Sequence, residues 1–347
     1  MKLIDLQQGN WEKYSGSILS LGVSGEWDDL MTDCPSIFSD SQGKYQLFYT
    51  GHSSRSHSWA IGLAESKDFS NWKKFPGNPV LTSGDARAWD QRIDGPAVFK
   101  YQDKYYLFYE ATPVVPFSQS QMSYKIPFFL RKALGGARRW WRSRQSLLLS
   151  QAVLHAQGRC IGFAESSDLY YWKKYSGNPV LRPSESDWDS RGVFSPFVFC
   201  KDDRFFLFYG GSDGLKISSG IAVSLDLANW QRNEKPILSP GSEGSWDDAS
   251  VLVVSVLKLE DAYVAFYEGQ NIRNEYAIGF AYSYDFIAWS KYENNPIIKK
   301  GSLGLVDERM VNSPHAFLKE ESLYIFYGSQ DFKMHGHSSM ARMISGK

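Results

Sequence analysis

A hairpin that recurs five times along the 347-residue chain is the feature that most limits its fold. Each copy joins a short apolar strand to an aromatic strand through a polar turn, which is the pattern of a β-hairpin. The second copy, at 94–111, begins DGPAVF and returns as YYLFYEA. The other copies lie at 33–51, 195–211, 250–269 and 313–329. A regular repeat of this kind predicts an array of similar units.

Two further strands follow most of the hairpins. The first such pair reads IGLAESKDFSNWKKFPGNPVL, in which the fourth strand carries a Trp. Equivalent segments lie at 161–181, 220–238 and 277–298. Four strands per unit, separated by polar turns, predict a propeller blade. An aromatic content of 16% supports this reading because aromatic residues favour strands.

The last unit lacks a fourth strand after its third, which we place at 338–344. At the other end of the chain, WEKYSGSIL at 11–19 resembles the fourth-strand sequence WKKYSGNPVL. We expect this N-terminal strand to complete the last blade and close the ring, which leaves no exposed sheet edge. The prediction is an all-β fold, a five-bladed β-propeller, built as a single domain over 1–347. A sandwich of independent hairpins is the alternative, but it has no reason to repeat a four-strand unit.

One segment, 112–157, interrupts the second blade. It mixes basic with bulky apolar residues, which suits an anionic membrane surface or a protein partner. An insertion that folds over the propeller is the alternative. Between Ala111 and Ala164 there are eight basic residues and no acidic ones, so the rest of the chain carries 30 basic against 38 acidic residues. An acidic body argues against a nucleic-acid ligand.

The three cysteines, Cys34, Cys160 and Cys200, form no CxxC or His-rich pattern. Free thiols in a reducing compartment are therefore expected. The first residues lack the apolar region of a secretory signal, and no run approaches the ~20 apolar residues that cross a bilayer. These observations predict a cytoplasmic protein.

The topology of a propeller predicts where the chemistry lies. First strands line the central channel, and each antiparallel second strand returns to the rim where the first began. Asp33 and Asp94 precede first strands, and Glu110 and Glu268 end second strands. We therefore expect one ring of carboxylates, of which at least one has a raised pKa. A protonated acid beside an ionised partner is what cleavage of a glycosidic bond needs. The structural alternative is that the Asp residues cap turns before a Pro.

The loops before the blades carry acidic elements, such as Trp246-Asp247-Asp248 and Val306-Asp307-Glu308, and Arg follows in three of them. A Trp-Asp pair at a blade boundary is usually structural, with the Trp packed and the Asp capping a turn. The functional reading is that these groups face the substrate. The predicted substrate-binding residues are Glu110, Arg92, Arg191, Asp248, Asp307, Arg309 and His315.

The DxP…YxLFY hairpins and the AxSxDxxxWxKxxxNPVL strands resemble those of the five-bladed propeller glycosidase superfamily, which includes glycoside hydrolase families 43, 32, 68 and 130. The resemblance covers nearly the whole chain apart from 112–157. Family 43 places an Asp base in blade one, a pKa-modulating Asp in blade two and a Glu acid in an EGP motif of blade three. Asp33 in TDCP and Asp94 in IDGP match the first two.

The third family 43 motif is absent. Blade three reads VFSP at 193–196, and the NSPH motif carries Asn312 where Glu is expected, although His315 matches. Either another carboxylate acts as the acid, for which we favour Glu268 with Glu110 as the alternative, or the chemistry differs from that of family 43. The resemblance also implies that calcium is sometimes held in the channel, near His315; no cofactor is otherwise expected.

Family 130 resembles the chain in the context of Asp94, where RIDGP stands against a motif such as RIEDPR. In that family phosphate, held by basic residues, can replace water as the nucleophile, and Arg92, Arg191 and Arg309 are candidates to hold it. Pairing of these arginines with neighbouring Asp residues is the structural alternative.

The sequence therefore predicts a glycoside hydrolase that acts on an oligo- or polysaccharide, with Asp33, Asp94 and Glu268 as catalytic residues. Two alternatives remain open at this point: a phosphate-dependent phosphorylase, and a glycan-binding propeller without catalysis.

Overall fold

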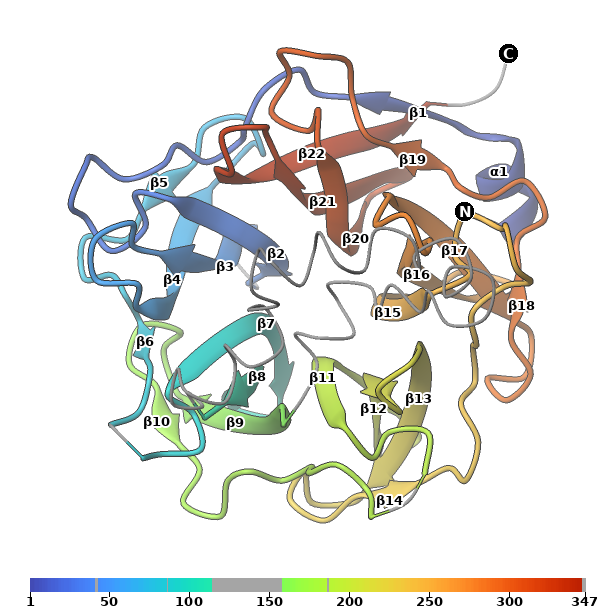
Figure 1. The fold of residues 1–347 in the computed structure, drawn as a ribbon, viewed down its shortest axis with the longest axis horizontal. Helices are drawn as coiled ribbons and strands as arrows, with labels where there is room; N and C mark the ends of the chain where they lie inside the picture. Colours follow the sequence, from blue (N-terminus) through green and yellow to red (C-terminus); the bar gives the residue numbers. More distant parts are fainter. Residues whose placement is uncertain (41–42, 86, 114–157, 186, 345–347) are drawn as a thin grey trace, which may run out of the picture.

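The structure, a computed structural model, describes residues 1–40, 43–85, 87–113, 158–185 and 187–344. The predicted insertion, 112–157, therefore lies almost wholly outside the described residues, and its partner prediction is untested. The described strands group into five four-stranded antiparallel units, which Figure 1 shows arranged around a common centre. We refer to them as blades one to five in the order of their first strands. The all-β propeller prediction is confirmed.

The first three blades follow the order of the chain. Blade one contains β2 (Met31–Ser39), β3 (Tyr45–His52), β4 (Trp59–Ser66) and β5 (Lys73–Lys74), with β6 (Leu81–Thr82) also paired to β4. Blade two contains β7 (Arg92–Tyr101), β8 (Lys104–Thr112), β9 (Cys160–Ser166) and β10 (Lys173–Lys174). Blade three contains β11 (Gly192–Lys201), β12 (Arg204–Ser212), β13 (Ile217–Ser224) and β14 (Gln231–Arg232).

The last two blades bring the two ends of the chain together. Blade four contains β15 (Ser250–Lys258), β16 (Tyr263–Gln270), β17 (Tyr276–Ser283) and β18 (Ser290–Lys291), with β19 (Ile298–Lys299) also paired to β17. Blade five contains β20 (Met310–Lys319), β21 (Ser322–Gln330), β22 (Gly336–Ile344) and β1 (Asn10–Lys13). The first strand of the chain pairs antiparallel with the last, from Asn10 opposite Ile344 to Lys13 opposite Ala341. The predicted closure by the N-terminal strand is confirmed.

The repeated Phe-Tyr pair of each second strand forms the core. The five Phe side chains and the five Tyr side chains at these positions are fully buried. They are Phe48, Phe108, Phe208, Phe266 and Phe326, followed by Tyr49, Tyr109, Tyr209, Tyr267 and Tyr327. Large buried aromatic rings contribute most of the apolar area of such a core. The short helix α1 (Leu3–Gln8) packs Leu3 and Leu6 against blades four and five.

A buried ion pair recurs in all five blades. An Asp from the loop before the blade accepts a hydrogen bond from a cation on the fourth strand, as in Lys74 to Asp28 at 2.6 Å. The other pairs are Lys174–Asp90, Arg232–Asp189, Lys291–Asp247 and Lys13–Asp307. In blade one the buried Tyr49 hydroxyl also donates to Asp28, at 2.9 Å. A buried carboxylate needs such partners, which explains why the Trp-Asp loops repeat.

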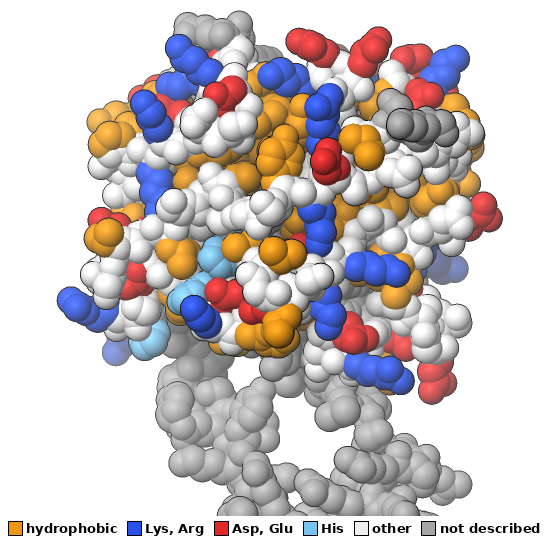
Figure 2. Space-filling view, turned by 90° about the horizontal axis from the view of Figure 1, so that it is seen from above, with side chains coloured by type: hydrophobic (Ala, Val, Ile, Leu, Met, Phe, Trp, Pro, Cys, Tyr) orange, Lys and Arg blue, Asp and Glu red, His pale blue; other side chains and the backbone are white. Residues whose placement is uncertain are grey.

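Figure 2 shows the side of the molecule that carries β1 and β22, where Lys and Arg side chains are interspersed with acidic ones and a few His side chains lie close together. Among the residues described, no helix combines the length and apolar character that a membrane crossing demands.

Candidate active site

A bulge in the first strand of every blade places one side chain at the mouth of the channel. The register shifts directly after this position in four blades, for example between Asp33 and Ser36 in blade one and between Asp94 and Ala97 in blade two. In blade four the shift comes one residue later, between Val253 and Ser255. The next residue takes the left-handed region in several blades, with φ of 50° at Cys34, 58° at Gly95 and 46° at Ser313. Bulges of this kind re-aim side chains beside functional sites.

Strand pairing defines two rings of five equivalent positions. Each first-strand residue lies opposite a second-strand residue, and the five pairs are Asp33–Thr50, Asp94–Glu110, Phe194–Gly210, Leu252–Glu268 and Asn312–Gly328. The polar members of the first ring lie on blades five, one and two, and the apolar members on blades three and four. Phe194, and not Ser195 after it, occupies the position equivalent to Asp94.

The glycines of the second ring leave room for neighbouring side chains. A Cβ on Gly328 would lie 1.8 Å from Asp33 Oδ1 and 2.1 Å from Asn312 Oδ1. A Cβ on Gly210 would lie 2.3 Å from Leu252 Cδ1. Side chains of the first ring therefore fill the space beside Gly210 and Gly328, and this leaves no room for a carboxylate at those two positions.

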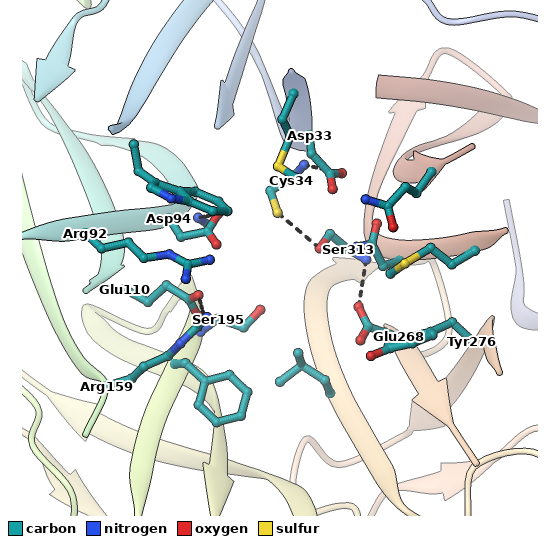
Figure 3. Close-up of a pocket in the computed structure, with 18 of the residues that line it drawn as sticks. Asp33, Cys34, Arg92, Asp94, Glu110, Arg159, Ser195, Glu268, Tyr276 and Ser313 are labelled. Atoms are coloured by element: carbon teal, nitrogen blue, oxygen red, sulfur yellow. Dashed lines mark hydrogen bonds and ion pairs between the residues drawn. The ribbon is translucent and has the colours of Figure 1, made fainter. Parts of the chain in front are cut away.

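The two rings enclose a cavity of about 320 Å³ (Figure 3). Six of the ten predicted site residues line it: Asp33, Asp94, Glu268, Glu110, Arg92 and Arg309. In Figure 3, Arg92, Asp94 and Glu110 lie on one side of the cavity, and Glu268 lies on the other. The structure thus gathers side chains from blades one, two, four and five into one pocket.

Two of these carboxyl groups titrate near neutrality. Burial raises the pKa of Asp33 to about 7, and the negative charge of Asp94 adds to the effect, while the Cys34 N–H opposes it at 2.7 Å. Burial also raises the pKa of Glu268 to about 7, against the Ser313 N–H that donates to its Oε2 at 3.0 Å. Each residue is only 6% exposed. Desolvation disfavours the charged form of an acid, so both groups can exchange protons at neutral pH.

Glu110 is held differently from Glu268. It forms an ion pair with Arg159 and accepts the Ser195 N–H at 2.6 Å. The Arg159 side chain is only 12% exposed, and burial lowers its pKa to about 10. An ion pair and a second donor favour the ionised form of a carboxylate. We therefore prefer Glu268 to Glu110 as the proton donor.

Arg159 was missed as a site residue, because the sequence analysis counted it only among the basic residues around the insertion. The sequence signal that could have identified Arg159 is its position directly before the third strand of blade two, at the end of that strand nearest the pocket. Trp59 and Tyr276 were also missed, although both line the pocket. They begin the third strands of blades one and four.

An aromatic platform supports Arg92. Its guanidinium lies 3.7 Å above the Trp59 ring, and Trp59 stacks on His52 with ring centroids 4.4 Å apart. Burial lowers the pKa of Arg92, while the charge of Asp94 opposes this effect. Cations favour the face of a Trp ring, so the platform holds a positive charge beside the carboxylates.

Four predicted site residues lie outside this pocket. Arg191 is exposed, with its side chain against Gly214. Asp248 accepts the N–H groups of Gly244 and Ile272, at 2.8 and 2.9 Å, and so fastens two loops. Asp307 belongs to the buried ion pair with Lys13.

His315, the fourth, lines a smaller cavity that adjoins the pocket and shares Cys34, Gly95, Ser195 and Ser313 with it. Burial lowers the pKa of His315 to about 4, so its imidazole is neutral. In the described part of the chain, the grouping of His and carboxylate side chains that fits a metal is Asp331, His335 and His337, which does not include His315. The predicted calcium is untested.

Curated proteins match parts of the chain, and no family model matches it. A 1,2-beta-oligomannan phosphorylase of Thermoanaerobacter sp. is 29% identical over 130 residues, which are 34% of this chain and 43% of that protein. An uncharacterised protein of Mycobacterium tuberculosis, Rv1502, is 31% identical over 107 residues, 29% of this chain and 35% of that protein. The chain thus spans less than half the length of these relatives.

Solved structures match over nearly the whole chain. One described as a BT0996 RGII complex is 17% identical, with a TM-score of 0.69, and the match covers 97% of this chain and 92% of that protein. A glycosyl hydrolase from Bacteroides ovatus is 14% identical, with a TM-score of 0.69, over 99% of this chain and 96% of that protein.

A third structure comes from work on family 130, described as mannoside phosphorylases that include hydrolases targeting beta-1,2 mannosidic linkages in Candida mannan. It is 14% identical, with a TM-score of 0.67, and the match covers 97% of this chain and 94% of that protein. The chain therefore has the propeller fold of glycoside hydrolase structures, as its repeated hairpins predicted.

Proposed function

We propose that the protein is an enzyme that cleaves a glycosidic bond of an oligosaccharide bound in the channel pocket. The observation that carries the proposal is the convergence of Asp33, Asp94 and Glu268 on one cavity. Two of these groups have pKa values of about 7. An enzyme of this class needs one acid that is protonated and one partner that is ionised at the same pH.

Glu268 is proposed as the general acid that protonates the leaving oxygen. Its carboxyl is buried, accepts the Ser313 N–H and makes no ion pair among the described residues. Asp33, on the first strand of blade one, is proposed to accept a proton from the attacking nucleophile. Asp94 is proposed to position the substrate and to raise the pKa of Asp33 through its charge.

β-1,2-Linked mannosides are the substrates we propose to test first. Two curated relatives, both of Thermoanaerobacter sp., carry the names 1,2-beta-oligomannan phosphorylase and beta-1,2-mannobiose phosphorylase. The pocket wall supports a sugar ligand because the aromatic side chains of Phe194 and Tyr276 line it. Aromatic faces pack well against the apolar face of a sugar ring, while the carboxylates and arginines hydrogen-bond its hydroxyl groups.

Phosphorolysis is a second candidate, favoured by the guanidinium groups beside the carboxylates. Arg92 and Arg309 both line the pocket. Arginine binds phosphate oxygens in a fixed, often bidentate geometry. In this variant inorganic phosphate would attack the anomeric carbon in place of water, while Glu268 would still protonate the leaving oxygen.

The test is an assay of the purified chain on β-1,2-mannobiose and longer β-1,2-oligomannans, with and without inorganic phosphate. Release of mannose without phosphate identifies hydrolysis, and formation of mannose 1-phosphate only when phosphate is present identifies phosphorolysis. The Asp94→Asn variant should lose about 100-fold or more in turnover with its fold intact. Asp103→Asn, an exposed position in the same hairpin, is the matched control and should keep full activity.

Full activity of Asp94→Asn would contradict the assignment of this residue. Saccharide binding by calorimetry, with no turnover on a broad panel of glycosides, would instead identify a glycan-binding propeller.

A further inference from the structure

The loop between β21 and β22 in blade five closes in the same way as the loop between β16 and β17 in blade four. The Asp331 N–H donates to the His335 carbonyl at 3.3 Å, and the Asn271 N–H donates to the Glu275 carbonyl at 3.2 Å. In return the His335 N–H donates to Asp331 Oδ1 at 3.0 Å, and the Glu275 N–H donates to Asn271 Oδ1 at 3.1 Å. Blade four shows that this loop does not require histidines.

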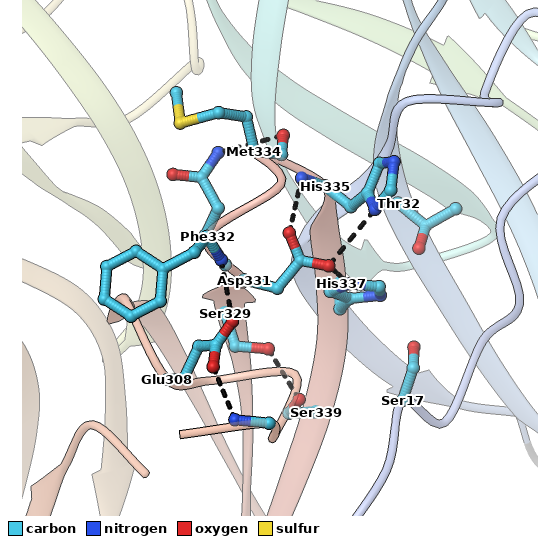
Figure 4. A network of polar contacts seen from close by, with 12 residues as sticks. Ser17, Thr32, Glu308, Ser329, Asp331, Phe332, Met334, His335, His337 and Ser339 are labelled. Atoms are coloured by element: carbon cyan, nitrogen blue, oxygen red, sulfur yellow. Dashed lines mark hydrogen bonds and ion pairs between the residues drawn. The ribbon is translucent and has the colours of Figure 1, made fainter. Parts of the chain in front are cut away.

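Blade five also carries His337, which takes no part in the hydrogen bonds that close the loop. His337 lies opposite Ser329 on β21, at the position that Ala277 takes opposite Gly269 in blade four. Its side chain turns toward Asp331, which also faces His335 (Figure 4). Asp331 Oδ2 lies 3.1 Å from His335 Nδ1 and 3.5 Å from His337 Nε2. Ligand atoms of all three side chains lie within 4.8 Å of one another.

The separations between these ligand atoms fit a metal site. A distance of 3.5 Å is long for a hydrogen bond to a carboxylate. In a tetrahedral zinc site with ligands about 2.0–2.1 Å from the metal, neighbouring ligand atoms lie roughly 3.3–3.4 Å apart. The two measured separations lie on either side of that value. Two imidazoles and one carboxylate, with a fourth position left to water, also form a known class of zinc site.

An ion can reach the cluster from solvent. The side chains of His335, Asp331 and His337 are 35%, 17% and 11% exposed. Without a metal, these ligand atoms can therefore still contact water. The cluster is also separate from the carboxylates of the pocket, none of which belongs to it.

We propose that Asp331, His335 and His337 form a binding site for a divalent first-row transition ion, with Zn²⁺ as the ion that fits the geometry. The bound ion would join β22 to the loop that precedes it. Gln330 and Met334, on either side of that loop, line the pocket, and the Gln330 side chain donates to the Met334 carbonyl at 3.2 Å. The ion thus holds one wall of the pocket in place. The proposal does not depend on the glycosidic activity.

The experiment measures zinc binding to the full-length protein, without an affinity tag and after removal of metals with a chelator. Calorimetry and elemental analysis should give one Zn²⁺ per molecule. His337→Ala, which installs the blade four residue, should weaken binding at least ~10-fold, the size of effect expected when a metal site loses a ligand or its support. The Tm should rise with Zn²⁺ in the unmodified protein and much less in this variant, because the ion binds only the folded state.

Two further variants separate a metal site from a loop that only needs its hydrogen bonds. The double variant Asp331→Asn, His335→Glu copies the pair of blade four, so it should keep the Tm of the metal-free protein but lose zinc binding. His57→Ala removes an exposed histidine outside the cluster and should bind zinc normally. The visible spectrum of the Co²⁺-loaded protein should show tetrahedral coordination. An absence of saturable zinc binding, or equal affinity in His337→Ala and the unmodified protein, would overturn the proposal.

Discussion

At the scale of single residues, one backbone position carries four different kinds of side chain in the five blades. The five bulges place Asp33, Asp94, Phe194, Leu252 and Asn312 at equivalent points around the channel. The scaffold is nearly symmetric, but the site is not, because acids cluster on two adjacent blades and apolar residues on two others. A pocket with a charged side and an apolar side can orient a sugar, which has hydroxyl edges and apolar faces.

The pKa values of the two buried acids predict a bell-shaped pH profile for kcat/KM. The nucleophile-activating Asp33 must be ionised, which requires a pH above about 7, and Glu268 must be protonated, which requires a pH below about 7. The rate should therefore peak near pH 7 and fall on both sides, by up to about tenfold per pH unit. Assays from about pH 5 to about pH 9 on a cleaved glycoside measure this. A rate that rises steadily to the top of that range would rule out Glu268 as the acid.

Replacing Glu268 should stabilise the protein at alkaline pH while it removes activity. Burial raises the pKa of Glu268 from 4.5 to about 7, so the folded state binds more protons than the unfolded state between these values. The unmodified protein therefore loses stability as the pH rises through that window. Glu268→Gln stays neutral and still accepts the Ser313 N–H, so it should be about 1–3 kcal/mol more stable than the unmodified protein near pH 8.

The measurement is chemical unfolding of Glu268→Gln and of the unmodified protein at about pH 4.5 and about pH 8, where the difference should be small at the lower pH. Glu293→Gln, at an exposed position, is the control and should show no pH-dependent gain. A stability difference that is the same at both pH values would contradict the raised pKa.

At the scale of elements, the second strand of each blade sets how much room the next blade's first strand has. Thr50, Glu110 and Glu268 fill this position in three blades, while Gly210 and Gly328 leave it open in the others. Where the residue is Glu, it accepts an N–H from the next blade, as Glu110 does from Ser195. Neighbouring blades are therefore fitted to one another at the site.

Gly328→Ala tests this fit. The new Cβ would lie 1.8 Å from Asp33 Oδ1, so the Asp33 side chain must move. Overpacking of this kind costs about 1–3 kcal/mol, and kcat should fall at least ~10-fold because the carboxylate leaves its position. Unfolding and steady-state kinetics measure the two effects. Gly16→Ala, whose new Cβ meets nothing within 4 Å, should change neither stability nor kcat. Normal turnover in Gly328→Ala would show that the Asp33 carboxylate keeps a productive position in spite of the added methyl group.

At the scale of the whole molecule, β1 supplies the fourth strand of blade five and, with Lys13, the cation of its buried ion pair. Lys13 donates to Asp307 at 2.6 Å, as Lys74 does to Asp28 and Lys291 does to Asp247. The ion pair therefore fastens the first strand of the chain to the loop before β20. We propose that the whole chain forms a single propeller domain around this closure.

Lys13→Met should open this closure and destabilise the whole protein. It leaves the Asp307 carboxylate, whose side chain is 5% exposed, without its cation. Removing one partner of a buried pair is strongly destabilising, and because Lys13 is partly exposed we expect a loss of about 1–3 kcal/mol. Thermal unfolding measures it. Glu12→Gln, at the exposed neighbouring position, should leave the Tm unchanged, and a Tm for Lys13→Met equal to that of the unmodified protein would refute the role of the pair.

The sequence by itself determined the architecture and the central carboxylates. Strand alternation, turns and the repeated Phe-Tyr pair can be read from short stretches of sequence. The blades, the closure by 11–19 and the meeting of Asp33, Asp94 and Glu268 at one rim followed from them. Each of these depends only on the order of residues along the chain and on the antiparallel path of a blade.

Only the tertiary structure decided which polar residues serve the pocket and which serve the fold. Asp248 and Asp307 are Asp residues in the same kind of loop, and their roles depend on partners such as Lys13, which lies at the opposite end of the sequence. The pairing of Arg159 with Glu110, and the convergence of His335 and His337 on Asp331, likewise depend on side-chain direction and burial. Those quantities arise from packing between distant segments, which a sequence pattern does not encode.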